Sequence, residues 1–178
     1  MKNGELSPND RGLLLCMTGN GKGKSTAAFG TVLRALGWGQ QVAVIQMVKA
    51  SRETGEWQFF RRFHPEVFFE IGGVGFTNTA GDHASAAQKT WQLCRRMLRE
   101  FPGDLLVIDE LNIALSLNFL EEEAVLADLA DRRPGLNVIV TGRNAPESLR
   151  NAADLVSEVM EVKHPYRQGI PARKGVDY

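Results

Sequence analysis

Apolar residues along this chain gather into short continuous runs, and the stretches between the runs have helical spacing. The runs cover residues 12–17, 41–47, 67–71, 104–108, 136–141 and 156–162. Their centres, such as Val-Ala-Val-Ile in the second run, are apolar at successive positions rather than at alternate ones. Strands that are apolar on both faces are typical of a parallel sheet covered by helices on both sides. The pattern therefore predicts an α/β fold with three layers and a mostly parallel sheet.

The intervening stretches predict helices over residues 25–36, 82–100 and 121–132. In the longest one, apolar side chains recur about one turn apart and form a single stripe, whereas polar and basic side chains lie opposite. The stripe consists of Ala87, Trp91, Cys94 and Leu98, and the basic group opposite consists of Arg95, Arg96 and Arg99. We interpret this basic group as a solvent-exposed face rather than a nucleic-acid site. The segment after Val162 contains two prolines and two glycines, and we expect it to be extended and to lie on the domain.

Size and composition indicate one globular domain in 178 residues, with a short extension expected over residues 1–11 and the domain over residues 12–178. The formal net charge is zero, so the chain as a whole is not directed toward nucleic acid or an anionic membrane. No apolar run approaches the roughly 18 residues that a membrane-spanning helix needs, and the polar extension does not resemble a signal peptide. Cys16 and Cys94 lie in apolar surroundings and are predicted to be buried free thiols. We therefore expect a cytoplasmic protein.

A glycine-rich motif directly follows the first apolar run and precedes the first predicted helix. It reads Thr18-Gly19-Asn20-Gly21-Lys22-Gly23-Lys24-Ser25. A strand, a glycine-rich turn, Gly-Lys-Ser and a helix form the setting in which a phosphate-binding loop works, because backbone N–H groups can face an anion at the positive end of the helix. The motif departs from the usual pattern at one position, where Thr18 replaces the first glycine.

Charged and hydroxyl side chains of this motif have the chemistry that nucleotide binding requires. Lys24 would bring a positive charge to the phosphates, and the hydroxyl of Ser25 would be a ligand for Mg²⁺. Lys22 adds another positive charge, which would either contact phosphate or face solvent. The residues themselves do not separate these two alternatives for Lys22.

Two acidic residues end the fourth apolar run. Asp109 and Glu110 follow the continuous run Leu-Leu-Val-Ile, and a carboxylate at the carboxyl end of such a strand commonly faces the Mg²⁺ beside a phosphate loop. The alternative is a strand end that simply meets solvent, but the neighbouring phosphate loop favours the metal role. Side chains of successive strand residues point to opposite faces, so the sequence leaves open which of the two acids faces the metal.

Two further segments follow predicted strands and would lie at the same edge of the sheet. Residues 72–79 contain three glycines and Phe76, which indicates either a mobile loop beside the strand ends or a surface loop with Phe76 folded into the core. Arg143 follows the fifth run, where its guanidinium would either contact phosphate or pair with Asp154 or Glu158.

The phosphate loop and several later segments together resemble the ATP:corrinoid adenosyltransferases of the phosphate-loop type. The resemblance rests on residues 18–30, 107–111, 139–143, 153–158, 162–170 and 172–178, so it covers nearly the whole chain from Gly12 onward. The loop of this family opens with Thr-Gly-Asn-Gly, which accounts for Thr18.

This resemblance implies a P-loop NTPase fold of the RecA-like kind, a homodimer, and alkylation of a corrinoid. Co(I) of the reduced corrinoid would attack C5′ of ATP and release triphosphate, with Mg²⁺ or alternatively Mn²⁺ as the cofactor and a flavoprotein as the reductant. The residues expected to contact ATP are Thr18, Gly19, Asn20, Gly21, Lys22, Gly23, Lys24, Ser25, Thr26 and Arg143, and those expected at the metal are Ser25, Asp109 and Glu110. Lys24 and Phe76 are the candidate catalytic residues, since Lys24 would stabilise the departing triphosphate.

Phe76 matches the phenylalanine of the family's Gly-Phe-Thr-Trp stretch, in which aromatic residues lie below the corrin ring and help to keep the lower cobalt position free. Asn78 stands where the tryptophan is expected. Some members of the family have an N-terminal helix that closes over the corrinoid, and residues 1–11 are too few to form it. Two other functions fit the phosphate loop: a small kinase or ATPase, and a non-catalytic nucleotide-dependent corrinoid carrier. The resemblance favours the adenosyltransferase, which needs no general base.

Overall fold

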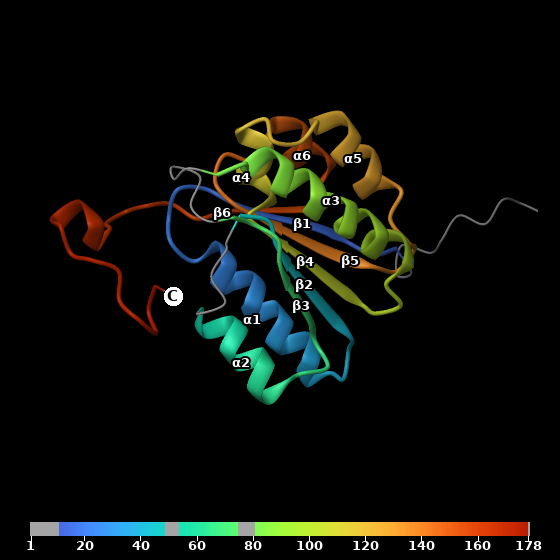
Figure 1. Ribbon diagram of the computed structural model, residues 1–178, viewed down its shortest axis with the longest axis horizontal. Coiled ribbons are helices and arrows are strands. Elements are labelled where there is room, and N and C mark those ends of the chain that lie inside the picture. Colours follow the sequence, from blue (N-terminus) through green and yellow to red (C-terminus); the bar gives the residue numbers. More distant parts are fainter. Residues whose placement is uncertain (1–10, 49–53, 75–80, 178) are drawn as a thin grey trace, which may run out of the picture.

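The computed structural model describes residues 11–48, 54–74 and 81–177 (Figure 1). Its strands are β1 Leu14–Thr18, β2 Val42–Gln46, β3 Phe68–Ile71, β4 Leu105–Asp109, β5 Asn137–Thr141 and β6 Leu155–Glu158. Its helices are α1 Lys24–Gly37, α2 Gly55–Phe63, α3 His83–Glu100, α4 Leu111–Ser116, α5 Glu122–Ala130 and α6 Glu147–Ala152, followed by a 3₁₀ turn, η1, at Pro165–Gln168.

The six strands form one sheet in the order β3-β2-β4-β5-β1-β6, and every neighbouring pair is parallel. Helices α1 and α2 lie on one face, whereas α3, α4, α5 and α6 lie on the other (Figure 1). This arrangement confirms the predicted three-layer α/β fold. Because all strands run the same way, their carboxyl ends meet at one edge, which is where ligands bind in open sheets of this kind.

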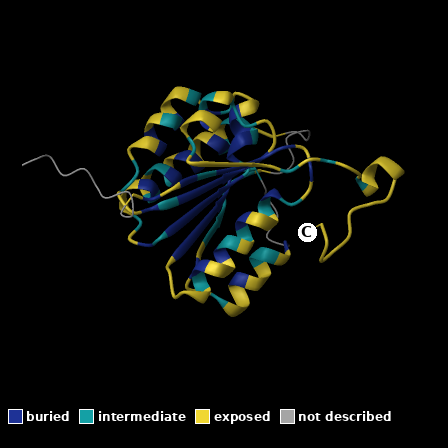
Figure 2. Ribbon diagram, turned by 180° about the vertical axis from the view of Figure 1, so that it is seen from behind, coloured by how far each residue is buried: buried dark blue, intermediate teal, exposed yellow. Residues whose placement is uncertain are grey.

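A hydrophobic core fills each side of the sheet, as Figure 2 shows by the buried strands between exposed helix surfaces. On the α1 side, Val107 and Ile139 pack with Val32. On the α3 side, Ile108 and Val140 belong to the other cluster, together with the apolar stripe of α3. The alternation of strand residues between two apolar layers explains why the runs in the sequence are continuous.

The predicted long helices are present, and side-chain caps fix where α3 and α5 begin. Asp82 accepts a hydrogen bond from the N–H of Ser85 at 3.0 Å at the start of α3, and Glu121 caps α5 in the same way. The shorter helices α2, α4 and α6 were not predicted. Cys16 and Cys94 are buried free thiols, as expected, and burial raises the pKa of both. No helix within the described ranges is both long and apolar enough to cross a bilayer.

The basic group on α3 is not simply a solvated face, which corrects the sequence interpretation in part. Arg95 and Arg99 both pair with Asp128 of α5, with the Arg95 Nε–Asp128 distance at 2.9 Å. The indole of Trp91 also donates to this carboxylate at 3.0 Å. Asp128 is buried, and these donors compensate its removal from water while joining α3 to α5.

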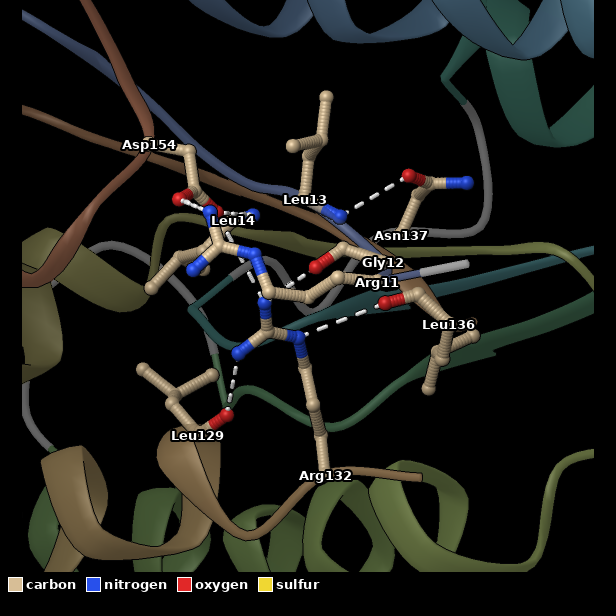
Figure 3. Close-up of polar contacts among 9 residues, drawn as sticks. All are labelled: Arg11, Gly12, Leu13, Leu14, Leu129, Arg132, Leu136, Asn137 and Asp154. Carbon is tan, nitrogen blue, oxygen red and sulfur yellow. Dashed lines mark hydrogen bonds and ion pairs between the residues drawn. The ribbon is translucent and has the colours of Figure 1, made fainter. Parts of the chain in front are cut away.

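At the amino end of the sheet, the buried part of Arg132 ties several segments together (Figure 3). Its guanidinium donates to the carbonyls of Gly12 at 2.6 Å, Leu129 at 2.8 Å and Leu136 at 3.4 Å. The carboxylate of Asp154 lies 3.8 Å from the Arg132 guanidinium and also pairs with Arg11. Burial lowers the pKa of Arg132, and Asp154 partly opposes that effect. The cation therefore joins the end of α5 to the starts of β1 and β5.

The chain leaves the sheet earlier than predicted, since β6 ends at Glu158 rather than continuing to Val162. We call residues 159–177 the C-terminal tail. Most of the tail is exposed, and it loops away from the domain before its end returns toward α1 (Figure 1). The expectation that the whole segment lies on the domain is therefore wrong for most of its length. Strand β6 is itself exposed along its whole length and lies at the edge of the sheet.

Candidate active site

The glycine-rich motif forms the connection between β1 and α1, so the predicted strand, loop and helix are all present. The backbone φ angle is 97° at Gly19 and 125° at Gly23, values that residues with a side chain rarely adopt. Gly23 is the N-cap of α1 and lets the loop turn directly into the helix at Lys24. The first turn of α1 thus presents its N–H groups toward the loop, as phosphate binding requires.

Lys24 lies inside the loop and is only 7% exposed. Its Nζ donates to the carbonyl of Gly21 at 2.7 Å. Burial lowers the pKa of Lys24, whereas the nearby carboxylates of Glu110 and Asp109 raise it and Arg143 lowers it further. The charges of both predicted acids and of Arg143 therefore lie near enough to Lys24 to act on it. A polyanion bound here would meet two cations and the helix N-terminus.

The outer side of the loop is held by the start of the C-terminal tail. The N–H of Gly21 donates to the carbonyl of Val159 at 2.7 Å. A Cβ atom at Gly21 would lie 2.5 Å from the carbonyl oxygen of Met160, so this close approach requires glycine. In this structure the N–H of Gly21 is therefore used to position the loop against the tail.

The remaining loop residues take different places. The hydroxyl of Thr18 accepts a hydrogen bond from the N–H of Ala145 at 3.1 Å, so it joins β1 to the segment after β5 that carries Arg143. Arg143 is exposed, and Asp154, one of its predicted alternatives, pairs with Arg11 and Arg132 instead. Lys22 pairs with Asp177 of the tail at 2.9 Å, an outcome that neither alternative for this residue included.

The two acids at the end of β4 differ in their surroundings. Asp109 is completely buried, and its carboxylate accepts hydrogen bonds from Gln46 at 2.8 Å and from Thr141 at 2.7 Å. It lies two residues beyond Val107, so it shares the face that α1 covers. Glu110 is the N-cap residue of α4 and has a left-handed φ of 66°, and its N–H donates to the Thr141 hydroxyl at 3.0 Å. Such a backbone in a residue other than glycine is typical of functional sites.

The donor set at this edge suits a hard divalent cation. Ser25, Asp109 and Glu110 offer oxygen ligands, which Mg²⁺ and Mn²⁺ prefer, and Mg²⁺ usually takes only one or two carboxylates beside phosphate oxygens and waters. Within the described residues no group of three or more His, Cys, Asp or Glu side chains is arranged to hold a metal. The hydroxyl of Ser25 and the carboxylates of Asp109 and Glu110 thus fit an Mg²⁺ ion that also takes phosphate oxygens as ligands.

Sequence reasoning missed the side chain of Gln46 and the hydroxyl of Thr141. Gln46 is a polar residue in an otherwise apolar strand, which was the available signal, and the parallel register places it opposite Asp109. The carbonyl of Gln46 also accepts from the N–H of Gly72, at the start of the segment 72–79. Phe76 and Asn78, the residues predicted to matter for the corrinoid, lie outside the described residues.

Comparisons with known proteins place the whole chain in a family. The family model for ATP:corrinoid adenosyltransferase BtuR/CobO/CobP matches residues 10–178. The chain is 45% identical over 173 residues to the corrinoid adenosyltransferase of Pseudomonas aeruginosa, covering 96% of this chain and 85% of that protein. It is 39% identical over 173 residues to the corrinoid adenosyltransferase CobA of Salmonella typhimurium, covering 95% and 87% of the two chains.

Two solved structures share the fold at low sequence identity. The flagellar accessory protein FlaH from Methanocaldococcus jannaschii has a TM-score of 0.56 at 14% identity, over 84% of this chain and 71% of that one. A KaiC-like protein from Pyrococcus horikoshii has a TM-score of 0.55 at 18% identity, over 86% and 74% of the two chains. The fold is thus that of P-loop NTPases. With a family match over nearly its whole length, the chain belongs to the ATP:corrinoid adenosyltransferase family BtuR/CobO/CobP.

Proposed function

We propose that this chain transfers the 5′-deoxyadenosyl group of ATP to Co(I) of a reduced corrinoid and releases triphosphate. Family membership supports the general part of this proposal, that the chain is an enzyme for ATP-dependent adenosylation of corrinoids. The observation that supports the finer statement is the phosphate loop, in which Lys24 lies beside Glu110 and Asp109. A kinase, an ATPase or a non-catalytic carrier is not favoured by family membership.

The proposed reaction asks the protein to stabilise a leaving group. A bond forms between cobalt and C5′ while the bond between C5′ and its oxygen breaks, and both electrons of that bond leave with the triphosphate. Lys24 and N–H groups at the start of α1 would stabilise the negative charge that develops there. A general base is not needed, because the nucleophile is the reduced cobalt itself.

We further propose that Ser25, Asp109 and Glu110 hold Mg²⁺, or alternatively Mn²⁺, together with the triphosphate. The ion would supply positive charge to the leaving group. Asp109 is buried on the α1 face, and Glu110 contributes to the electrostatics of Lys24, so both acids are near the loop. Thr18, whose hydroxyl bonds Ala145, would shape the loop, and Arg143 would contact the phosphates.

We also infer a homodimer, a flavoprotein reductant and a cytoplasmic location. The exposed apolar residues of the tail support an assembly: Val162 is 93% exposed, Tyr166 77% and Met160 76%. Contiguous exposed apolar surface commonly marks a protein interface. The reductant and the aromatic role of Phe76 below the corrin ring follow from the family resemblance alone.

The assay that tests the function supplies ATP, Mg²⁺ and chemically reduced cobalamin to the purified chain. We expect adenosylcobalamin and triphosphate in equal amounts, and formation of ADP or phosphate instead would contradict the proposal. Replacing Lys24→Ala should lower turnover at least about a hundredfold, because one charge is lost from the leaving-group site. Lys89→Ala, which removes an exposed lysine of α3, is the matched control and should retain the wild-type rate.

A further inference from the structure

A row of three polar side chains crosses the carboxyl edge of the sheet on the α1 face. Gln46 of β2 lies directly opposite Asp109 of β4 in the parallel register. Thr141 ends β5, the next strand in the sheet, and its hydroxyl is 2.7 Å from the same carboxylate. All three residues are completely buried, although each follows apolar residues on the same face.

The row fixes the orientation of the Asp109 carboxylate. The Nε2 of Gln46 donates to Oδ2 at 2.8 Å, and the Oγ1 of Thr141 donates to Oδ1 at 2.7 Å. Each carboxylate oxygen therefore has one donor from a neighbouring strand. A carboxylate oxygen can accept more than one hydrogen bond, so these two donors orient the group without by themselves using all of its lone pairs.

The same threonine also holds the second acid. The Thr141 hydroxyl donates its proton to Asp109 and accepts a hydrogen bond from the N–H of Glu110 at 3.0 Å. The hydroxyl has one proton, so the bond to the carboxylate leaves its lone pairs for that N–H. This contact supports the left-handed backbone of Glu110, which would otherwise be strained.

Gln46 connects this row to the segment that carries Phe76. Its backbone carbonyl accepts from the N–H of Gly72 at 3.0 Å, while its side chain contacts Asp109. The other amide atom, Oε1, is buried and meets no hydrogen-bond donor within the described residues. The reverse amide orientation would turn this oxygen toward the carboxylate, so the assigned orientation is the favourable one. An unsatisfied buried acceptor costs folding free energy, which indicates a role other than packing.

We propose that Gln46 and Thr141 are positioning residues, which aim the carboxylates of Asp109 and Glu110 at the metal ion and triphosphate of ATP. The proposal rests on the metal assignment made above and adds the residues that orient the ligands. Neither side chain touches ATP in this role. Ligands of a metal ion are commonly oriented by such hydrogen-bonded neighbours, and their loss lowers metal affinity or activity about 10- to 100-fold.

The test measures ATP binding by calorimetry with Mg²⁺ and with EDTA, in the absence of corrinoid so that no turnover occurs. In the wild-type chain we expect Mg²⁺ to tighten ATP binding. Thr141→Val keeps the shape of the side chain and removes both hydrogen bonds. In this variant the factor by which Mg²⁺ tightens ATP binding should be about tenfold or more smaller than in the wild type. Thr141→Ser keeps the hydroxyl and should restore most of it. Gln46→Met should behave like Thr141→Val, since it removes the amide at similar length.

Controls separate positioning from a general structural effect. Thr31→Val removes a hydroxyl that bonds only the helix carbonyl of Ala27 among the contacts seen, and it should leave the Mg²⁺ gain unchanged. Thermal unfolding of every variant shows whether it is folded, and kcat should fall more than KM rises for Thr141→Val. The proposal is overturned if folded Thr141→Val keeps the full gain, or if Thr141→Ser loses as much as Thr141→Val. Failure of the metal assignment would look different, because wild-type ATP binding would then be indifferent to Mg²⁺.

Discussion

At the residue scale, charged groups at the carboxyl edge of the sheet are held by named neighbours. Lys24 donates to Gly21, Asp109 accepts from Gln46 and Thr141, and Lys22 pairs with Asp177. Groups that are already oriented need little reorganisation when charge develops on a leaving group, which is the basis of electrostatic stabilisation. The position of the loop backbone depends on its close contact with the tail at Gly21.

Gly21→Ala tests this close approach. The new Cβ would lie 2.5 Å from the Met160 carbonyl oxygen, so the loop or the tail must move, and we expect ATP to bind about tenfold or more weakly. Gly30→Ala is the matched control, because its Cβ meets nothing within 4 Å outside α1 and alanine favours a helix over glycine. Calorimetry measures both variants. Equal ATP affinity in Gly21→Ala and the wild type would contradict the contact.

The sequence predicted those site residues whose position follows from local order along the chain. Lys24 and Ser25 are placed by the loop motif, and Asp109 and Glu110 by the end of an apolar run. Gln46 and Thr141 were missed because their role depends on which strands are neighbours and in which register, which is not local information. The Gly21 contact with Val159 was missed for the same reason, since more than a hundred residues separate the two.

At the element scale, long helices with a full apolar stripe were predicted well, whereas short ones were not. Helices α4 and α6 have six residues each, less than two turns, so a helical period cannot be recognised in them. Buried charged side chains join other helices and strands to one another, at sites distant from the nucleotide loop. Asp128 connects α3 with α5, and Arg132 connects the end of α5 with the starts of two strands.

Replacing Arg132→Leu should destabilise the fold without touching the nucleotide loop. The carbonyls of Gly12, Leu129 and Leu136 would lose their guanidinium donor, and a buried polar group left unsatisfied costs roughly 1–3 kcal/mol. We expect a loss of about 3 kcal/mol in the free energy of unfolding, measured by urea denaturation. Arg96→Leu, on the exposed side of α3, is the matched control and should change stability by less than about 0.5 kcal/mol. Equal effects of the two substitutions would contradict this role for Arg132.

At the scale of the whole molecule, the C-terminal tail reaches back to the N-terminal loop. Its first residue, Val159, bonds both Thr18 and Gly21, and Asp177 at its end pairs with Lys22. The composition of the tail predicted an extended segment but not its path, because its exposed residues leave no pattern of burial to follow. The tail and the loop of residues 18–25 therefore meet through contacts that only the fold brings together.

The pairing of Lys22 with Asp177 should appear in the titration of the tail. The hydrogen bond from Lys22 holds the pKa of Asp177 below its ordinary value, and the N–H of Arg173 adds to this. The contact is thus fully present above about pH 4, the ordinary range of aspartate, and is lost as pH falls through the lower pKa of the folded state. Carboxyl NMR measures this value. In Lys22→Met the pKa should rise but stay below the ordinary value, and an unchanged pKa would contradict the ion pair.

The path of the tail also has a consequence for protein handling. Lys163, Arg167, Arg173 and Lys174 are all exposed in a stretch outside the sheet, so a protease that cuts after basic residues would act there before it reached the domain. Each such cut separates Asp177 from the body and releases Lys22. A preparation nicked in this way would keep its core and its melting temperature while its nucleotide loop had lost a partner, and intact mass would reveal the difference.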